Sequence, residues 1–302
     1  MQLWRINLKP QNAASIDPRE RCITSKIVGI GWPLENKEVP IDKADYYHKG
    51  WLEYKDRKKD KGWKGAADAI CHKIQIDDLV WTRTLNGVYY IGRVTSDWRY
   101  DSSDDAYEAD ILNVRDCDWQ IVGTVGDVPG KVATSFMNQT LRRVPGPGVM
   151  SFSKITYNRL SDQHFYDLTD MGAGNIFNFL LPDEVEDIVA LYLQKEKGLL
   201  VLPSTGKINT SHYEFEMINP TNGEPTFVQV KNGAENLICD QYDKKYGHFY
   251  LFTSSGNYIG EEPSHITCIT AKEIKDFIDI NPTIMPPSVR KRLEYYKSIN
   301  LV

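Results

Sequence analysis

The chain has 302 residues, of which 41% are hydrophobic and 25% charged, and its formal net charge is −5. This composition is that of an ordinary folded protein, and the length predicts about two domains that each bury a core. The sequence shows no low-complexity tract, no signal peptide and no apolar run close to the roughly 20 residues of a membrane span. An acidic total disfavours general polyanion binding, but nucleic-acid binding depends on local charge and stays open.

The five cysteines are widely spaced and form no C-x-x-C pair. An odd, scattered count argues against a disulfide framework or a zinc site. It is typical of a reducing compartment, so we expect a cytoplasmic protein.

Short strands separated by turn signals dominate the first half of the chain. Asn86-Gly87 joins two of them in a tight hairpin, and residues 63–71 show the best helix pattern. Several short strands with one or two helices predict a small curved or closed β-barrel. The prolines and glycines within 144–162 predict a linker to a second domain. The five expected strands are residues 1–6, 27–32, 78–84, 88–95 and 111–114.

The second half mixes helices and strands. An amphipathic pattern follows Pro182 and ends at Gly198, as expected for a helix with proline in its first turn and glycine after its last. Thr270 and Glu273 have the spacing of a capping box. The expected elements are a helix at 183–197, a buried strand at 199–203, a hairpin at 213–231, a strand at 249–252, a helix from 270 to 280 and a helix from 288.

The hairpin concentrates polar side chains on one face. Alternation along the strands puts Glu214, Glu216, Gln229 and Lys231 on the same side. If the turn at 222–223 is two residues long, Glu216 faces Gln229 and Glu214 faces Lys231. Carboxylates beside a lysine suit metal-assisted phosphodiester cleavage, because oxygen ligands hold Mg²⁺ and an ammonium orients water or offsets charge on the phosphate. Ordinary cross-strand charge pairing on a solvated face gives the same pattern.

This order of helix, strand, hairpin and strand resembles the PD-(D/E)xK nuclease fold. Within that fold it is similar to the Mrr-like restriction endonucleases, in which glutamine replaces the second carboxylate. The resemblance covers about residues 165–295 and implies a second domain at 165–302 with a mixed sheet flanked by helices. It also implies that Glu186, Glu214 and Gln229 bind Mg²⁺ or Mn²⁺, and that these three act in catalysis with Lys231.

Two features depart from the family pattern. The first acidic position holds Glu214 where the family usually has Asp, and Glu216 is an alternative ligand. Gln-x-Lys is only three residues long, so specificity comes from the conjunction of motifs. A degraded, inactive nuclease and an unrelated α+β domain stay open as alternatives.

Four segments of the first half carry a second resemblance: Leu-Trp-Arg-Ile at 3–6, Val-Gly-Ile-Gly-Trp at 28–32, Asp-Asp-Leu-Val-Trp-Thr-Arg at 77–83, and Tyr-Tyr-Ile-Gly-Arg-Val-Thr at 89–95. They look like the PUA-like superfamily, near the EVE-type modules, over about residues 1–150. Such modules hold a flipped or modified base by ring stacking and edge hydrogen bonds. Trp32, Trp98 and Tyr100 at strand ends are therefore candidates for an aromatic cage, with Asp97 as a base-edge reader. The alternative is that Trp32 and Trp98 plug the barrel ends.

Together these features predict an α+β protein of two domains, a PUA-like β-barrel at 1–150 and a restriction-endonuclease-like α/β core at 165–302. The leading hypothesis is a Mg²⁺-dependent DNA endonuclease of restriction or anti-phage defence, whose first domain senses a base or its modification. RNA is not excluded as a partner. A homodimer is expected, because each site cuts one strand. The alternative is a non-catalytic reader of modified DNA or RNA with an inactive, nuclease-like dimerisation domain.

Overall fold

A computed structural model of the chain describes residues 1–8, 15–57, 62–137, 140–168, 174–205, 213–254 and 257–300. The chain forms two compact units. Unit 1 comprises Met1–Gly174 with Tyr295–Val302, and unit 2 comprises Asn175–Glu294. Each unit combines helices with a sheet, as the α+β prediction requires.

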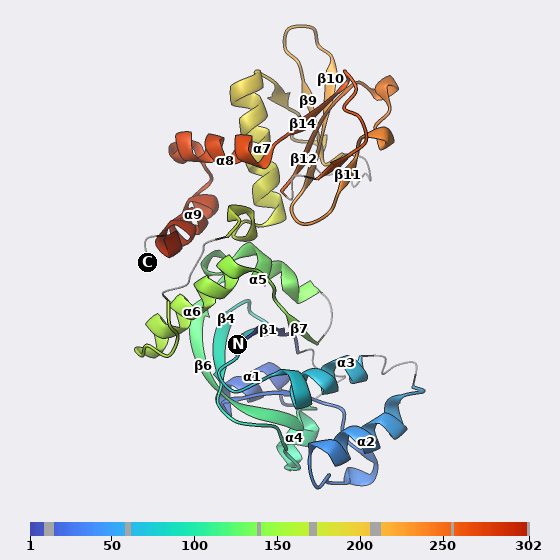
Figure 1. The fold of residues 1–302 in the computed structure, drawn as a ribbon, viewed down its shortest axis with the longest axis vertical. Helices are drawn as coiled ribbons and strands as arrows, with labels where there is room; N and C mark the ends of the chain where they lie inside the picture. Colours follow the sequence, from blue (N-terminus) through green and yellow to red (C-terminus); the bar gives the residue numbers. More distant parts are fainter. Residues whose placement is uncertain are drawn as a thin grey trace. The chain divides into compact units, whose positions relative to one another are not determined.

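A curved sheet forms the centre of unit 1 (Figure 1). Its strands are β1 (Leu3–Ile6), β2 (Ile27–Ile30), β3 (Leu79–Arg83), β4 (Tyr89–Val94), β5 (Arg99–Tyr100), β6 (Asn113–Gly123) and β7 (Leu141–Arg143). Their order is β2-β6-β4-β3-β1-β7, with β5 paired to β6, and only β1 and β3 run parallel among these neighbours. Within the described residues β2 and β7 are not paired, so the sheet is open rather than closed.

The long strand β6 carries the sheet around its curve. Its first residues pair with β2 and β5, and its later residues pair with β4. The sequence predicts a strand only at 111–114, which overlaps the beginning of β6. The prediction ends there because charged residues interrupt the apolar pattern after Val114. Arg115 is nevertheless buried there, and its guanidinium donates to the carbonyl oxygens of Ile70 and Cys71. These bonds satisfy a charge that the sequence pattern alone places in solvent.

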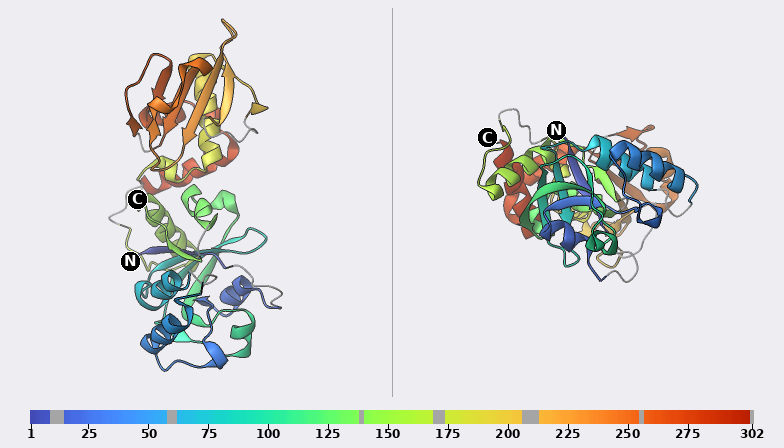
Figure 2. Two further views of the ribbon diagram at one scale, coloured as in Figure 1. Left: turned by 90° about the vertical axis from the view of Figure 1, so that its right-hand side faces the viewer. Right: turned by 90° about the horizontal axis from the view of Figure 1, so that it is seen from below.

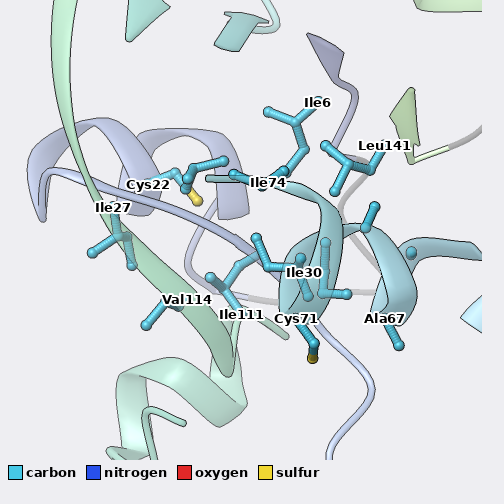
Figure 3. Close-up of a cluster of buried hydrophobic side chains, with 14 of the residues drawn as sticks. Ile6, Cys22, Ile27, Ile30, Ala67, Cys71, Ile74, Ile111, Val114 and Leu141 are labelled. Atoms are coloured by element: carbon cyan, nitrogen blue, oxygen red, sulfur yellow. The ribbon is translucent and has the colours of Figure 1, made fainter. Parts of the chain in front are cut away.

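Helices cover the sheet of unit 1 and complete its core. They are α1 (Pro18–Thr24), α2 (Lys43–Tyr54), α3 (Trp63–Asp68) followed by a π-helical turn (Ala69–Lys73), α4 (Asp104–Glu108), α5 (Gly130–Thr134) and α6 (Pro147–Ser161). Figure 3 shows part of the core, where Ile6, Ile30 and Val114 from three strands gather with Ala67 and Cys71 from the helical segment. The helix expected at 63–71 is therefore confirmed.

The linker expected at 144–162 is wrong, because most of it is α6. Pro147 occupies the first turn of that helix, and Gly146 before it has φ +135°, so proline and glycine here mark a helix start. Trp81 donates its indole N–H to Ser153 at 3.0 Å, and Tyr157 donates to Asp118 at 2.5 Å. The helix belongs to unit 1, and the boundary between units falls at residues 174 and 175.

A mixed sheet forms the centre of unit 2 (Figure 2). It has five strands in the order β14-β12-β10-β9-β8. Its strands are β8 (Leu200–Val201), β9 (Phe215–Ile218), β10 (Pro225–Lys231), β12 (His248–Thr253) and β14 (Ile266–Ile269), beside a small pair of β11 (Leu237–Ile238) and β13 (Tyr258–Ile259). β10, β12 and β14 run parallel, whereas β9 is antiparallel to β10 and to β8. The helices of unit 2 are α7 (Pro182–Lys197) and α8 (Ala271–Ile280), and the first part of α9 (Pro287–Asn300) also belongs to it.

The two faces of this sheet are covered differently. Phe215 and Val228 are paired and buried on the face that packs against α7. On the other face, Phe249 and Leu251 form a core with residues of the segment 237–242, which contains β11 and a 3₁₀ turn. The expected flanking by helices therefore holds for the α7 face, and a strand-and-turn segment covers part of the other.

Most boundaries expected in unit 2 are confirmed. Helix α7 ends at Gly198 with φ +67°, and Thr270 and Glu273 form a capping box at the start of α8. The buried strand expected at 199–203 is wrong, because β8 is a two-residue edge strand and Leu200 is 55% exposed. No helix in the described part of the chain is long and apolar enough to cross a membrane.

Candidate functional site

The hairpin of unit 2 has a longer turn than the sequence predicted. The N–H of Gly223 donates to the carbonyl of Asn219, and the strands pair Glu216 with Phe227. This register is shifted by two residues from that of a two-residue turn, so Glu214 lies across from Gln229 instead of Lys231. The predicted pairings are wrong. The predicted face is right, because a shift of two residues leaves every side chain on its original side.

Three polar side chains meet where β10 ends. Gln229 donates its amide N–H to Oε1 of Glu214 at 2.6 Å, and the Lys231 ammonium lies 3.1 Å from the same oxygen. Glu216 takes another partner, since it accepts the hydroxyl of Tyr213 at 2.8 Å. The geometry therefore groups Glu214, and not Glu216, with Gln229 and Lys231.

The amide oxygen of Gln229 is buried without a hydrogen-bond partner. The residue is 1% exposed, and no described group donates to its Oε1. Leaving a buried acceptor unpaired costs about 1–3 kcal/mol, so such an atom calls for a water or an ion. The unpaired oxygen of Gln229 and the amide N–H that it donates to Glu214 belong to the same side chain. An unsatisfied acceptor therefore lies close to a carboxylate.

Glu186 brings a second carboxylate to this region from α7. Burial and then the charges of Glu214, Asp183 and Asp187 raise its pKa to about 7, against an opposing effect of Lys231. Glu186 therefore lies within electrostatic reach of both Glu214 and Lys231. It also lines an open groove of about 560 Å³ beside Phe215.

The predicted donor set is two carboxylates and one amide oxygen. The structure brings Glu214 and Gln229 into contact, whereas Glu186 lies on α7, which covers the opposite face of the sheet, and is linked to Glu214 only through its charge. Among the described residues, no three His, Cys, Asp or Glu side chains form a group that could hold a metal ion. The set at Glu186, Glu214 and Gln229 is nonetheless all oxygen, which suits Mg²⁺ because that ion keeps several waters and uses one or two carboxylates. The unpaired Gln229 oxygen and the mutual repulsion of the two glutamates both fit a cation there.

Residues that the sequence analysis missed fix the surrounding backbone. The side-chain amide of Asn232, directly after Lys231, donates to the carbonyl oxygens of Phe177 and Leu180 at 3.2 Å. In the first turn of α7, buried Glu184 forms an ion pair of 2.9 Å with Arg292 of α9. No local sequence pattern indicates these contacts, because the partners are 52 to 108 residues apart in the chain.

Of the three aromatic residues predicted in unit 1, Trp98 and Tyr100 contact a common ring, whereas Trp32 is joined to it through its backbone carbonyl. Trp98 and Tyr100 both lie against Tyr46 of α2, each with ring centroids 5.8 Å apart. The hydroxyl of Tyr46 donates to the carbonyl of Trp32 at 3.1 Å. Tyr46 was not predicted, although its place in an aromatic-rich helix was a signal for it. We call Trp32, Tyr46, Trp98 and Tyr100 the aromatic cluster.

Trp32 has an unusual backbone conformation, with φ +63°. A bulky residue in this left-handed region costs about 1–3 kcal/mol, and such strain gathers at functional sites. Asn113 stabilises it by donating to the carbonyl of Gly31 at 2.8 Å, while accepting the indole N–H of Trp98 at 3.2 Å. At Gly31 a Cβ atom would lie 2.2 Å from the Asp110 carboxylate, so any other residue there requires that carboxylate to move.

Asp97 is already engaged within unit 1. Its carboxylate lies 2.9 Å from Lys43 and 3.1 Å from Arg115, and it accepts the N–H of Trp98 at 2.7 Å. The Lys43 hydrogen bond, the Trp98 N–H and the Arg115 charge lower its pKa. A contact between Asp97 and a base edge stays a prediction, and it requires the carboxylate to share or leave these partners.

Comparisons with known proteins assign no function to the chain. A family described as a domain of unknown function, DUF8426, matches residues 4–145, which lie within unit 1. No curated protein matches. Among solved structures, the DNA modification-dependent restriction endonuclease AspBHI matches with 10% identity over 91% of this chain and 79% of its own. Its TM-score is 0.24, and at that value the match carries no argument about fold or function.

Proposed function

We propose that unit 2 is a divalent-metal-dependent phosphodiester hydrolase acting on DNA, and that unit 1 binds a base through its aromatic cluster. The observation that carries the proposal is the Gln229 side chain, which donates to Glu214 while its own buried oxygen lacks a partner. In this proposal Glu186, Glu214 and Gln229 bind Mg²⁺ or Mn²⁺. The cation supplies Lewis-acid stabilisation of a phosphate oxygen when bound.

The roles of the residues follow from their charges and positions. Glu214 is held by Gln229 and Lys231, so its carboxylate is oriented before any ligand binds. Lys231 is partly exposed, so its ammonium can also contact a phosphate and offset the charge that develops during hydrolysis. Glu186 has a pKa of about 7 because burial and neighbouring carboxylates disfavour its charge, and a nearby cation or Lys231 lowers that cost.

Support for base binding by unit 1 comes from the aromatic cluster. Trp32, Trp98 and Tyr100 are partly buried against a core that includes Tyr46, and Trp32 is held in a strained conformation. Aromatic faces bind unstacked bases with little sequence preference, so any specificity must come from edge contacts such as that proposed for Asp97.

Plasmid cleavage by the full chain tests the proposal. We expect nicking or cutting with Mg²⁺ or Mn²⁺, loss of activity in EDTA, and no cutting by Lys231→Ala at unchanged melting temperature. Lys272→Ala is the matched control, because that lysine is 82% exposed on α8 and pairs only locally with Asp276. Wild-type rates in Lys231→Ala would remove Lys231 from the mechanism. DNA binding without any cutting of modified or unmodified substrates would instead support the non-catalytic reader.

A further inference from the structure

An aromatic pocket opens in unit 2, on the sheet face that carries Gln229. The cavity measures about 210 Å³. Phe227 of β10 lines it, with its ring centroid 5.0 Å from that of Tyr213 and 5.3 Å from that of Phe249. We call this cavity the base pocket; it is lined by Tyr213, Phe227, Gln241, Tyr242, Asp243, Tyr246 and Phe249.

The walls of the base pocket are fixed, and its mouth is open. Phe249 is 3% exposed and Tyr242 is 7% exposed, and their ring centroids lie 5.2 Å apart. Tyr246 is 58% exposed and stands in a 3₁₀ turn, Lys244–Tyr246. A rigid aromatic floor with an exposed aromatic side chain at the rim is suited to stacking a planar ring between them.

The base pocket is next to the candidate catalytic residues. Phe227 and Gln229 are alternate residues of β10, so they share a face about 6.6 Å apart along the strand. Tyr213 immediately precedes Glu214. The pKa of Tyr242 is raised to about 12 by burial, with contributions from Cys239 and from the Glu214 carboxylate. A ligand bound beside Glu214 and Lys231 would therefore lie next to Tyr213, a residue that lines the base pocket.

The rim carries positive charge and hydrogen-bonding groups. Lys245 lies 4.8 Å from the ring centre of Tyr246 and 3.1 Å from the Asp243 carboxylate. Lys244 on the same turn is exposed. A cation beside an aromatic ring is the combination that binds a base and its phosphate together.

We propose that the base pocket receives one nucleobase of an unpaired or extruded nucleotide, adjacent to a phosphodiester whose charge Lys231 offsets. This inference rests on the function proposed above. The cavity is smaller than the roughly 300–1,000 Å³ of sites for drug-sized ligands, so a single planar group fits it better than a larger molecule. Gln241 and Asp243 supply edge contacts, and the aromatic walls accept every base.

The test compares two short single strands of mixed sequence, one intact and one with the same backbone but no bases. Binding to the full chain is measured in EDTA, which prevents cutting. We expect Tyr246→Ala to weaken binding of the intact strand about 5- to 150-fold, the usual effect of losing one base stack, and to leave the base-free strand unchanged. Ile280→Ala is the matched control, since that side chain is 76% exposed on α8 of the same unit.

Phe227→Leu provides a second variant, because it keeps an apolar side chain in the pocket but removes the ring. It should weaken the intact strand selectively at a melting temperature close to that of the wild type. Equal loss on both strands, or no loss in either variant, overturns the base pocket, as does absence of wild-type binding. Cleavage that proceeds normally in Tyr246→Ala at all substrate concentrations refutes the base pocket alone, whereas base-dependent binding without any cutting refutes the hydrolase alone.

Discussion

The side-chain amide nitrogen of Gln229 lies 2.6 Å from Oε1 of Glu214, although the chain separates the two residues by a six-residue connection and parts of two strands. The same Glu214 oxygen faces the Lys231 ammonium at 3.1 Å. One carboxylate oxygen is thus bound by an amide and a cation, while the amide's own oxygen is buried and unpaired. This asymmetry distinguishes the site from an ordinary surface charge pair, which leaves no buried atom unsatisfied.

Exchange of single glutamates tests which carboxylate belongs to the site. Glu214→Gln should abolish cleavage, because it removes the negative charge that faces Lys231 and the proposed cation. Glu216→Gln should retain cleavage, since a glutamine can still accept the Tyr213 hydroxyl. Rates of plasmid cutting at several Mg²⁺ concentrations measure both. If Glu216→Gln is inactive and Glu214→Gln is active, the metal ligand is Glu216, the next residue on the same face of the strand.

Adding a carboxylate at position 229 should make stability depend on metal. Gln229→Glu puts a second negative group beside Glu214, so the variant should melt below the wild type in EDTA. Divalent cations should raise its melting temperature by more than they raise that of the wild type, because a ligand that binds only the folded state stabilises it by mass action. Thermal unfolding with and without Mg²⁺ or Mn²⁺ measures this without any substrate.

The control for that experiment is Gln163→Glu, which adds the same charge at an exposed position of unit 1. It should show the wild-type response to metal. An identical metal shift in all three proteins would mean that no cation binds near Gln229.

The buried pair of Glu184 and Arg292 should be important for the stability of unit 2. Arg292 is 1% exposed, and Arg292→Met leaves the Glu184 carboxylate buried without its cation. Breaking such a pair costs about 3–5 kcal/mol, whereas the double variant Glu184→Gln, Arg292→Met should recover part of that loss. Hydrogen exchange of the α7 amides measures it. Protection in α7 that is unchanged in Arg292→Met would contradict the prediction.

Tryptophan fluorescence provides an internal reference for that experiment. All seven tryptophans belong to the sequence of unit 1, the last being Trp119. Their unfolding signal should therefore change little in Arg292→Met if the effect is confined to unit 2.

An element is predicted well from the sequence when the residues that determine it lie close together in the chain. Helix α7 and the capping box at Thr270 were predicted to within a residue, because periodicity and caps lie within a few neighbouring residues. The shared face of Gln229 and Lys231 was also predictable, since alternation survives a change of register by two. The pairing of residues across the two hairpin strands was not predictable, because Asn222-Gly223 lies within a longer turn that begins at Asn219.

Elements that depend on distant partners were missed for a physical reason. Strand β6 continues through Arg115, whose burial is compensated by carbonyl groups some 45 residues away. Pro147 and Gly148 predict a linker where helix α6 forms, because the buried contact of Ser153 with Trp81 is not visible in the local sequence. Tyr46 lies in an aromatic-rich helix, but its contacts with Trp98 and Tyr100 join residues too far apart in the sequence for a local pattern to indicate.

Replacement of Trp98 by alanine distinguishes a base-binding cluster from a structural plug. If its ring stacks on a base, binding should fall by about 1–3 kcal/mol, and the loss should depend on which base or modification the DNA carries. Cleavage at saturating DNA should persist, because Glu214 and Lys231 belong to unit 2. Trp51→Ala is the matched control, since that ring is 40% exposed on α2 and lies outside the aromatic cluster. Binding to a panel of modified and unmodified duplexes, together with melting temperature, measures the effect. Uniform weakening of all duplexes with a large drop in melting temperature would show that Trp98 is a structural plug.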